Sequence, residues 1–136
     1  MIKEKIKLEE LLGIHQVLGY LFNSLLQEKT HYWLDRIFEP IEKESKKLNE
    51  SRKRLIDKYV TRDEDGKPTL SPDKTKFEFE PDKLIALEKE FGELLQEETE
   101  INIYKFKWED FKDIKITGLM RRILKQRFII DEVPEV

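Results

Sequence analysis

The chain has 136 residues, of which 38% are hydrophobic and 40% charged, and its formal net charge is −3. Charged residues make up roughly a quarter of a typical globular domain, so this chain is rich in charge. Its 26 basic and 29 acidic side chains nearly cancel, which predicts no overall attraction to nucleic acid or to an anionic membrane. The chain contains no cysteine, which excludes disulfides, thiol chemistry and cysteine-ligated metal sites.

The length predicts a single domain, residues 1–136, with residues 131–136 as a loose tail. The first residues, MIKEKIKLEE, are too charged for a signal peptide. No apolar run approaches the roughly 20 residues that a membrane span needs. We therefore expect a cytoplasmic protein without membrane contact. The excess of Lys and Glu is typical of proteins from hot environments, so a thermophilic host fits this composition. Helices with charge pairs four residues apart would produce it equally well.

The beginning of the chain predicts a short strand followed by a buried helix. KEKIKL alternates apolar and polar side chains at Ile6 and Leu8, which is the period of a strand. Apolar side chains then recur at the three- and four-residue spacing of a helix. This stripe predicts a helix buried along a broad face, and it contains Leu8, Leu11, Leu12, His15, Leu18, Phe22, Leu25 and Leu26.

A second helical pattern runs from Thr30 to Tyr59. The hydroxyl of Thr30 can accept a hydrogen bond from a free amide of the first turn, so we expect it to be the N-cap. Pro40 lacks a backbone N–H and clashes with the preceding turn, which predicts a kink or break near Glu39. Beyond the proline, a thin apolar edge predicts a long helix packed on one side.

The next segment predicts a loop, a strand and a third helix. Asp65-Gly66 signals a turn within the loop Thr61–Thr75. Residues 76–80, KFEFE, alternate and predict a strand, and Pro81 is typical of the first position of a helix.

Glutamates gather where the third helix ends, and their carboxylates oppose the negative end of the helix dipole. From Glu100 the apolar side chains recur every second residue, which predicts a strand. We expect this strand to pair with residues 76–80. The alternation shifts phase between Ile103 and Tyr104, which predicts a bulge or burial of both faces.

The last predicted element is a helix from Gly118 to about Phe128, capped by Thr117. Together, these elements predict a mainly helical α+β fold. Three to four helices pack with a small antiparallel β-sheet.

The order of the motifs resembles a family of small bacteriophage and prophage proteins of unknown function. The resemblance rests on IKLEELL, FEPIEKESKKLNESRKRLIDKY, DEDGKP, ALEKEFGELLQEETEINIY and FKDIKIT, and it covers about residues 6 to 128. The basic RRILKQR segment departs from the family's pattern. The resemblance implies a phage or prophage origin, a site of action in the host cytoplasm, and no catalytic residues to carry over.

The residues themselves predict no catalytic, cofactor or metal site. His15 and His31 lie on different predicted helices, and neither has the spacing of a metal-binding motif. His15 falls on the apolar stripe, which favours a histidine at the edge of the core. The glycines are scattered singly, so no phosphate-binding loop is present, and we expect the protein not to be an enzyme.

Two groups of side chains are candidates for binding a partner. Tyr32 and Trp33 lie off the apolar seam of their helix, so we expect one of them to be exposed. Exposed aromatics among charges are typical of protein contacts, and packing in the core is the alternative for these rings. Arg121, Arg122 and Lys125 share one face of the last helix and are suited to bind phosphates, although cations near a helix end also suit the helix dipole.

These features predict a small, phage-type cytosolic protein that acts without catalysis by binding another protein, whether a host enzyme, a defence component or a phage factor. One alternative is an accessory protein that binds nucleic acid through the basic face of the last helix. Another is a minor component of the virion or of its assembly, which predicts self-association.

Overall fold

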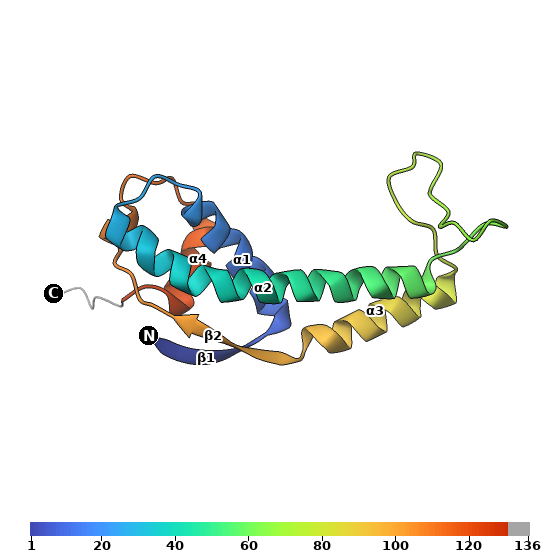
Figure 1. The fold of residues 1–136 in the computed structure, drawn as a ribbon, viewed down its shortest axis with the longest axis horizontal. Helices are drawn as coiled ribbons and strands as arrows, with labels where there is room; N and C mark the ends of the chain where they lie inside the picture. The colour runs from blue at the N-terminus through green and yellow to red at the C-terminus, as the bar shows by residue number, and fades with distance from the viewer. Residues whose placement is uncertain (131–136) are drawn as a thin grey trace. The chain divides into compact units, whose positions relative to one another are not determined.

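A computed structural model describes residues 1–130 of the chain (Figure 1). The tail predicted for residues 131–136 lies outside the described residues. The chain divides into two compact units, one made of Met1–Ser45 and the segment from Glu98 onward, and the other of Lys46–Glu97. We call them unit 1 and unit 2 and describe each by itself. The prediction of a single domain stays a prediction.

Unit 1 contains a two-stranded antiparallel sheet made of β1 (Ile2–Lys7) and β2 (Glu98–Ile103). The register places Ile6 opposite Thr99 and Ile2 opposite Ile103. Because side chains alternate between the faces of a sheet, Ile6, Ile101 and Ile103 are buried on one face. On the other face, lysines of β1 lie opposite glutamates of β2, at Lys5↔Glu100 and Lys7↔Glu98.

The predicted partner of β2 was therefore wrong. Residues 76–80 form no strand, and Phe77 makes only an isolated bridge with Leu70. The charges give a physical reason. The lysines of β1 complement the glutamates of β2, whereas KFEFE itself carries two glutamates and only one lysine. The predicted bulge is also absent among residues 98–104, because the strand ends at Ile103.

Helix α1 (Leu8–Phe22) begins directly after β1 and ends four residues earlier than its apolar stripe predicts. Six of its side chains are buried, but Leu12, expected within the stripe, is 46% exposed. Helix α4 (Gly118–Arg127) packs beside Gly13 of α1, where an added Cβ would lie in ordinary van der Waals contact, 3.4 Å from Cδ1 of Ile123. As predicted, Thr117 caps α4, and its hydroxyl accepts a hydrogen bond from the amide of Met120 at 3.2 Å.

Helix α2 (Glu28–Tyr59) runs without a break through Pro40, so of the kink or break predicted near Glu39 the break was wrong and the kink stays a prediction (Figure 1). A proline inside a helix costs about 3 kcal/mol. The cost is offset because Leu34 and Ile41, on either side of it, are fully buried. The helix also begins before Thr30, which is buried within the first turn and is not the N-cap.

Tyr104–Lys107 leads from β2 into a short 3₁₀ helix, η1 (Trp108–Phe111). The backbone of Phe106 pairs with the end of the described chain, donating to Phe128 O at 2.7 Å and accepting from Ile130 N at 2.9 Å. The core of unit 1 collects fully buried side chains from both strands, from α1, α2 and α4, and from the segments that follow β2 and α4; among them are Ile6, Leu11, Leu18, Leu21, Leu34, Ile37, Ile41, Ile103, Phe106, Leu124 and Phe128.

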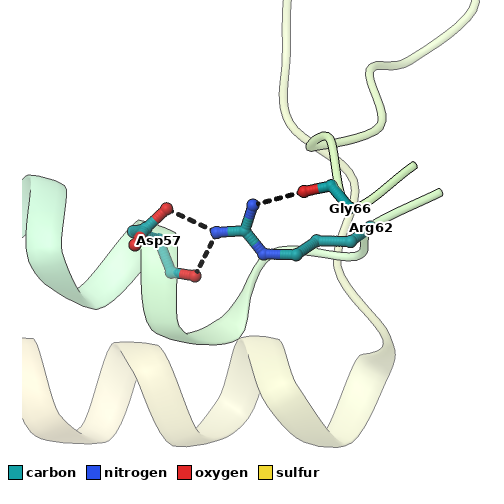
Figure 2. A network of polar contacts seen from close by, with 3 residues as sticks. All are labelled: Asp57, Arg62 and Gly66. Atoms are coloured by element: carbon teal, nitrogen blue, oxygen red, sulfur yellow. Dashed lines mark hydrogen bonds and ion pairs between the residues drawn. The ribbon is translucent and has the colours of Figure 1, made fainter. Parts of the chain in front are cut away.

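Unit 2 contains the second half of α2, a long loop and α3 (Pro81–Leu95), with Pro81 at the first position of the helix as predicted (Figure 1). Arg62 fastens the loop to the end of α2 (Figure 2). Its guanidinium donates to the backbone carbonyl of Asp57 at 2.9 Å, to the Asp57 carboxylate, and to the carbonyl of Gly66 at 2.9 Å. Gly66 has a φ of 78°, a conformation that suits glycine in the predicted turn.

Four α-helices and one small antiparallel sheet among residues 1–130 confirm the prediction of a mainly helical α+β fold. Within this part of the chain, no helix combines the length and the apolar character that a membrane crossing requires.

Candidate protein-interaction site

The two aromatic residues predicted to bind a partner differ in exposure. Tyr32 is 53% exposed, whereas Trp33 is half-buried. The Trp33 ring stacks on Tyr104 with centroids 4.7 Å apart and an interplanar angle of 6°. Tyr32 meets the edge of Trp33 at 5.4 Å. Trp33 is therefore held rigidly in place, and Tyr32 is the ring available at the surface.

Arg36 extends this cluster, and the sequence analysis did not select it. Its guanidinium lies 5.6 Å from the ring centroids of Tyr32 and Trp33 and donates a hydrogen bond to the Tyr32 hydroxyl at 3.0 Å. Arg36 follows Tyr32 by four residues, and this spacing puts their side chains next to each other on neighbouring turns of the helix. The contact could therefore have been predicted from the sequence.

The three predicted basic residues of α4 have different surroundings. The guanidinium of Arg121 lies over the Trp108 ring at 4.7 Å from the centroid. Arg122 and Lys125 are exposed, and neither makes a hydrogen bond or ion pair with residues 1–130. The segment from Tyr104 to Phe111 thus supports both predicted groups, since Tyr104 holds Trp33 and Trp108 holds Arg121.

Two pockets between α1 and α4 are the second feature of this unit; they share Ile123 in their linings, and we call them together the α1–α4 groove. At one end it forms a pocket of about 310 Å³ that is mostly apolar. Leu119, one of its lining residues, is 67% exposed, and Tyr20 is 45% exposed. The Tyr20 hydroxyl donates to the carbonyl of Lys115 at 2.8 Å, which fixes the ring in the wall. The pocket is lined by Gln16, Val17, Tyr20, Thr117, Leu119, Met120 and Ile123.

The other pocket of the groove has a volume of about 600 Å³, and its lining is about equally polar and apolar. Ile123 and Gly13 line it together with charged residues at the start of α1. Arg127 donates to Glu4 at 2.7 Å and to Glu10 at 2.8 Å, so one guanidinium joins β1, α1 and α4. Burial lowers the pKa of Arg127, but the hydrogen bonds with these two carboxylates outweigh it and raise the pKa above its usual value.

Sequence reasoning missed the α1–α4 groove. Tyr20, which lines the pocket, was not selected at all, and Leu12 of the predicted buried stripe is exposed but lines neither pocket. Leu119 falls in a helix with a single buried side chain, Leu124. The sequence shows apolar residues on the outward sides of both helices. It does not show that these residues lie close together, because that depends on how α1 packs on α4.

Both histidines stack on phenylalanines of unit 1. The ring of His15 lies 5.4 Å from Phe38, and that of His31 lies 4.8 Å from Phe22. His15 is half-buried, as expected for a histidine at the edge of the core. Within residues 1–130, no group of three or more histidine, aspartate or glutamate side chains is arranged to hold a metal ion.

No protein-family model, curated protein or solved structure matches this chain.

Proposed function

We propose that the protein acts without catalysis and binds an amphipathic helix of another protein in the α1–α4 groove. The observation that carries this proposal is the exposure of apolar side chains around the pocket of about 310 Å³. Leu119 is 67% exposed and Tyr20 45%. Apolar side chains clustered in a groove are typical of surfaces that bind a partner.

The dimensions and charges of the groove suit one kind of occupant. The ten residues of α4 span about 15 Å, which is enough to hold about three turns of a helix. Arg122 lies three residues after Leu119 and four before Gln126, both of which line the groove, so its cation lies at the rim. A bound helix would place its apolar stripe in the groove and acidic side chains beside Arg122.

The distribution of cations favours a protein over nucleic acid. Helix α4 carries four basic residues, but Arg127 is neutralised by Glu4 and Glu10 and Arg121 lies over Trp108. Arg122 and Lys125 remain for phosphate contacts, too few for tight binding to a polyanion. The motif order that resembles phage proteins supports a cytoplasmic partner of host or phage origin.

The test compares Leu119→Glu with Leu25→Glu. Leu25 is fully exposed and does not line the groove, so the same change from leucine to glutamate at this position is the matched control. Tagged wild-type protein captures partners from host lysate treated with nuclease, and the captured protein is then purified and titrated against all three forms. We expect Leu119→Glu to weaken binding at least tenfold, because it places a charge in the apolar pocket, and Leu25→Glu to change it less than twofold.

Equal binding by Leu119→Glu and wild type would contradict the groove as the site. Binding that disappears after nuclease treatment, and is lost in an Arg122→Glu/Lys125→Glu variant, would favour the nucleic-acid alternative.

A further inference from the structure

Strand β1 is an edge strand that pairs on one side only. Its partner is β2, and the sheet has no third strand within residues 1–130. In an antiparallel pair, each strand directs the N–H and C=O groups of every second residue to its partner, and those of the intervening residues to the opposite side. Apart from the ladder with β2, no backbone group of residues 2–6 hydrogen-bonds with another backbone group of residues 1–130. Strand β1 therefore offers donors and acceptors for one more strand.

This edge lies on the outside of unit 1. In the view of Figure 1, β1 is the outer strand, and β2 lies between it and the helices of this unit. Lys3 and Lys5 are exposed, and Ile2 is 59% exposed. The six residues of β1 span about 20 Å, which is the length of an ordinary strand.

The lysines of β1 lie on the exposed face of the sheet, because they alternate with the buried Ile6. Across the ladder they face one amide and two carboxylates, at Lys3↔Asn102, Lys5↔Glu100 and Lys7↔Glu98. Within residues 1–130, the side chains of Lys3 and Lys5 make no hydrogen bond or ion pair. A strand added on the other side of β1 would therefore lie beside two available cations.

These charges select the kind of strand that fits. Acidic side chains opposite lysines stabilise a pair of strands, whereas like charges opposite each other destabilise it. A second copy of β1 does not fit, because antiparallel pairing about a twofold axis would place lysines opposite lysines. Nucleic acid is disfavoured as well, because Glu98 and Glu100 lie beside the lysines on the same face.

We propose that β1 binds an extended segment of another protein as a third strand of the sheet, and that this segment carries an acidic side chain at every second position. Its carboxylates lie beside Lys3 and Lys5, and its intervening side chains lie on the face of Ile2. Main-chain hydrogen bonds supply the affinity, and the alternation of side chains supplies the specificity. No residue of β1 lines either pocket of the α1–α4 groove, so this site does not rest on the function proposed for the groove.

Fluorescence polarisation with labelled ten-residue peptides measures this binding. One peptide alternates glutamate and valine, and a second has the same composition with its residues arranged in pairs. We expect wild type to bind the alternating peptide at least tenfold more tightly than the paired one, and Lys3→Glu to weaken that binding at least fivefold. Lys3 lies opposite Asn102, so the new carboxylate faces no like charge within the sheet. Lys29→Glu, the same change at an exposed lysine of α2, should stay within twofold of wild type.

Methylation of the peptide's amides tests the strand pairing itself on the wild-type protein. Only every second amide of a bound strand faces β1. Methylating one alternate set of amides should therefore weaken binding at least tenfold, and methylating the other set should change it less than threefold. Equal effects of the two sets, equal binding of the alternating and paired peptides, or equal weakening by Lys3→Glu and Lys29→Glu would each overturn the proposal.

Discussion

Arg127 forms two of the ion pairs that hold unit 1 together. Its two terminal nitrogens donate to separate carboxylates, Glu4 on β1 and Glu10 on α1. The side chain of Arg127 is 24% exposed and that of Glu4 33%, so water screens this ion pair less than one at an open surface. Only a guanidinium has the forked geometry to hold both carboxylates at once.

Replacing Arg127 with methionine should lower the free energy of unfolding by about 1–3 kcal/mol, the usual effect of losing hydrogen bonds to charged groups. Methionine keeps much of the apolar stem, so the loss of stability measures the effect of leaving Glu4 and Glu10 without their cation. Urea unfolding monitored by circular dichroism measures the effect.

Arg122→Met is the matched control, because Arg122 is exposed and makes no ion pair within residues 1–130. Its free energy of unfolding should change by less than about 0.5 kcal/mol. If both variants lost the same stability, the network around Arg127 would have no specific role.

At the scale of elements, Glu90 joins α3 to the end of α2. Hydrogen bonds from the Tyr59 hydroxyl and from Lys58 stabilise the ionised carboxylate, which lowers its pKa below the ordinary 4.5. The same contact with Glu90 raises the pKa of Lys58. Both charges are therefore present at neutral pH.

Because the folded state holds the Glu90 proton less tightly than the unfolded state does, this carboxylate contributes stability above about pH 4.5. The contribution is lost as the pH falls through the lowered pKa. Glu90→Gln should thus be less stable than wild type at pH 7, and the difference should shrink as the pH falls below about 4. Urea unfolding at a fixed protein concentration, repeated between about pH 7 and pH 3, measures it.

Glu93→Gln provides the reference, since the Glu93 side chain has no hydrogen bond or ion pair among the described residues. Its stability relative to wild type should not vary with pH in this range. A pH-independent effect of Glu90→Gln would show that the carboxylate does not hold the two helices together through its charge.

Elements could be predicted from the sequence where their signals are local. Thr117 caps α4 and Pro81 opens α3 because each acts within one turn of its own helix. Pro40 misled the prediction, because the burial that keeps α2 continuous comes from packing in unit 1. The partner of β2 was missed for a similar reason, since β1 lies at the opposite end of unit 1's sequence, before α1.

The candidate site was harder to predict than the fold. The exposed ring of Tyr32 could be expected, because an aromatic residue off the apolar seam is visible in the sequence. Arg36, Trp108 and the groove beside Leu119 depend on contacts that only the folded chain creates. Periodicity indicates which side of a helix is apolar, but not which other helix lies beside it.

At the scale of the whole molecule, burial is unevenly distributed between the two units. Helix α1 buries six side chains, including Leu11 and Leu21 at 0% exposure, whereas α3 buries none. Backbone amides in a helix without buried contacts open at low free energy and exchange their hydrogens rapidly. Amides of α3 should therefore exchange before those of α1 in native-state hydrogen exchange followed by mass spectrometry. Exchange at equal rates in α1 and α3 would contradict the uneven burial of the two units.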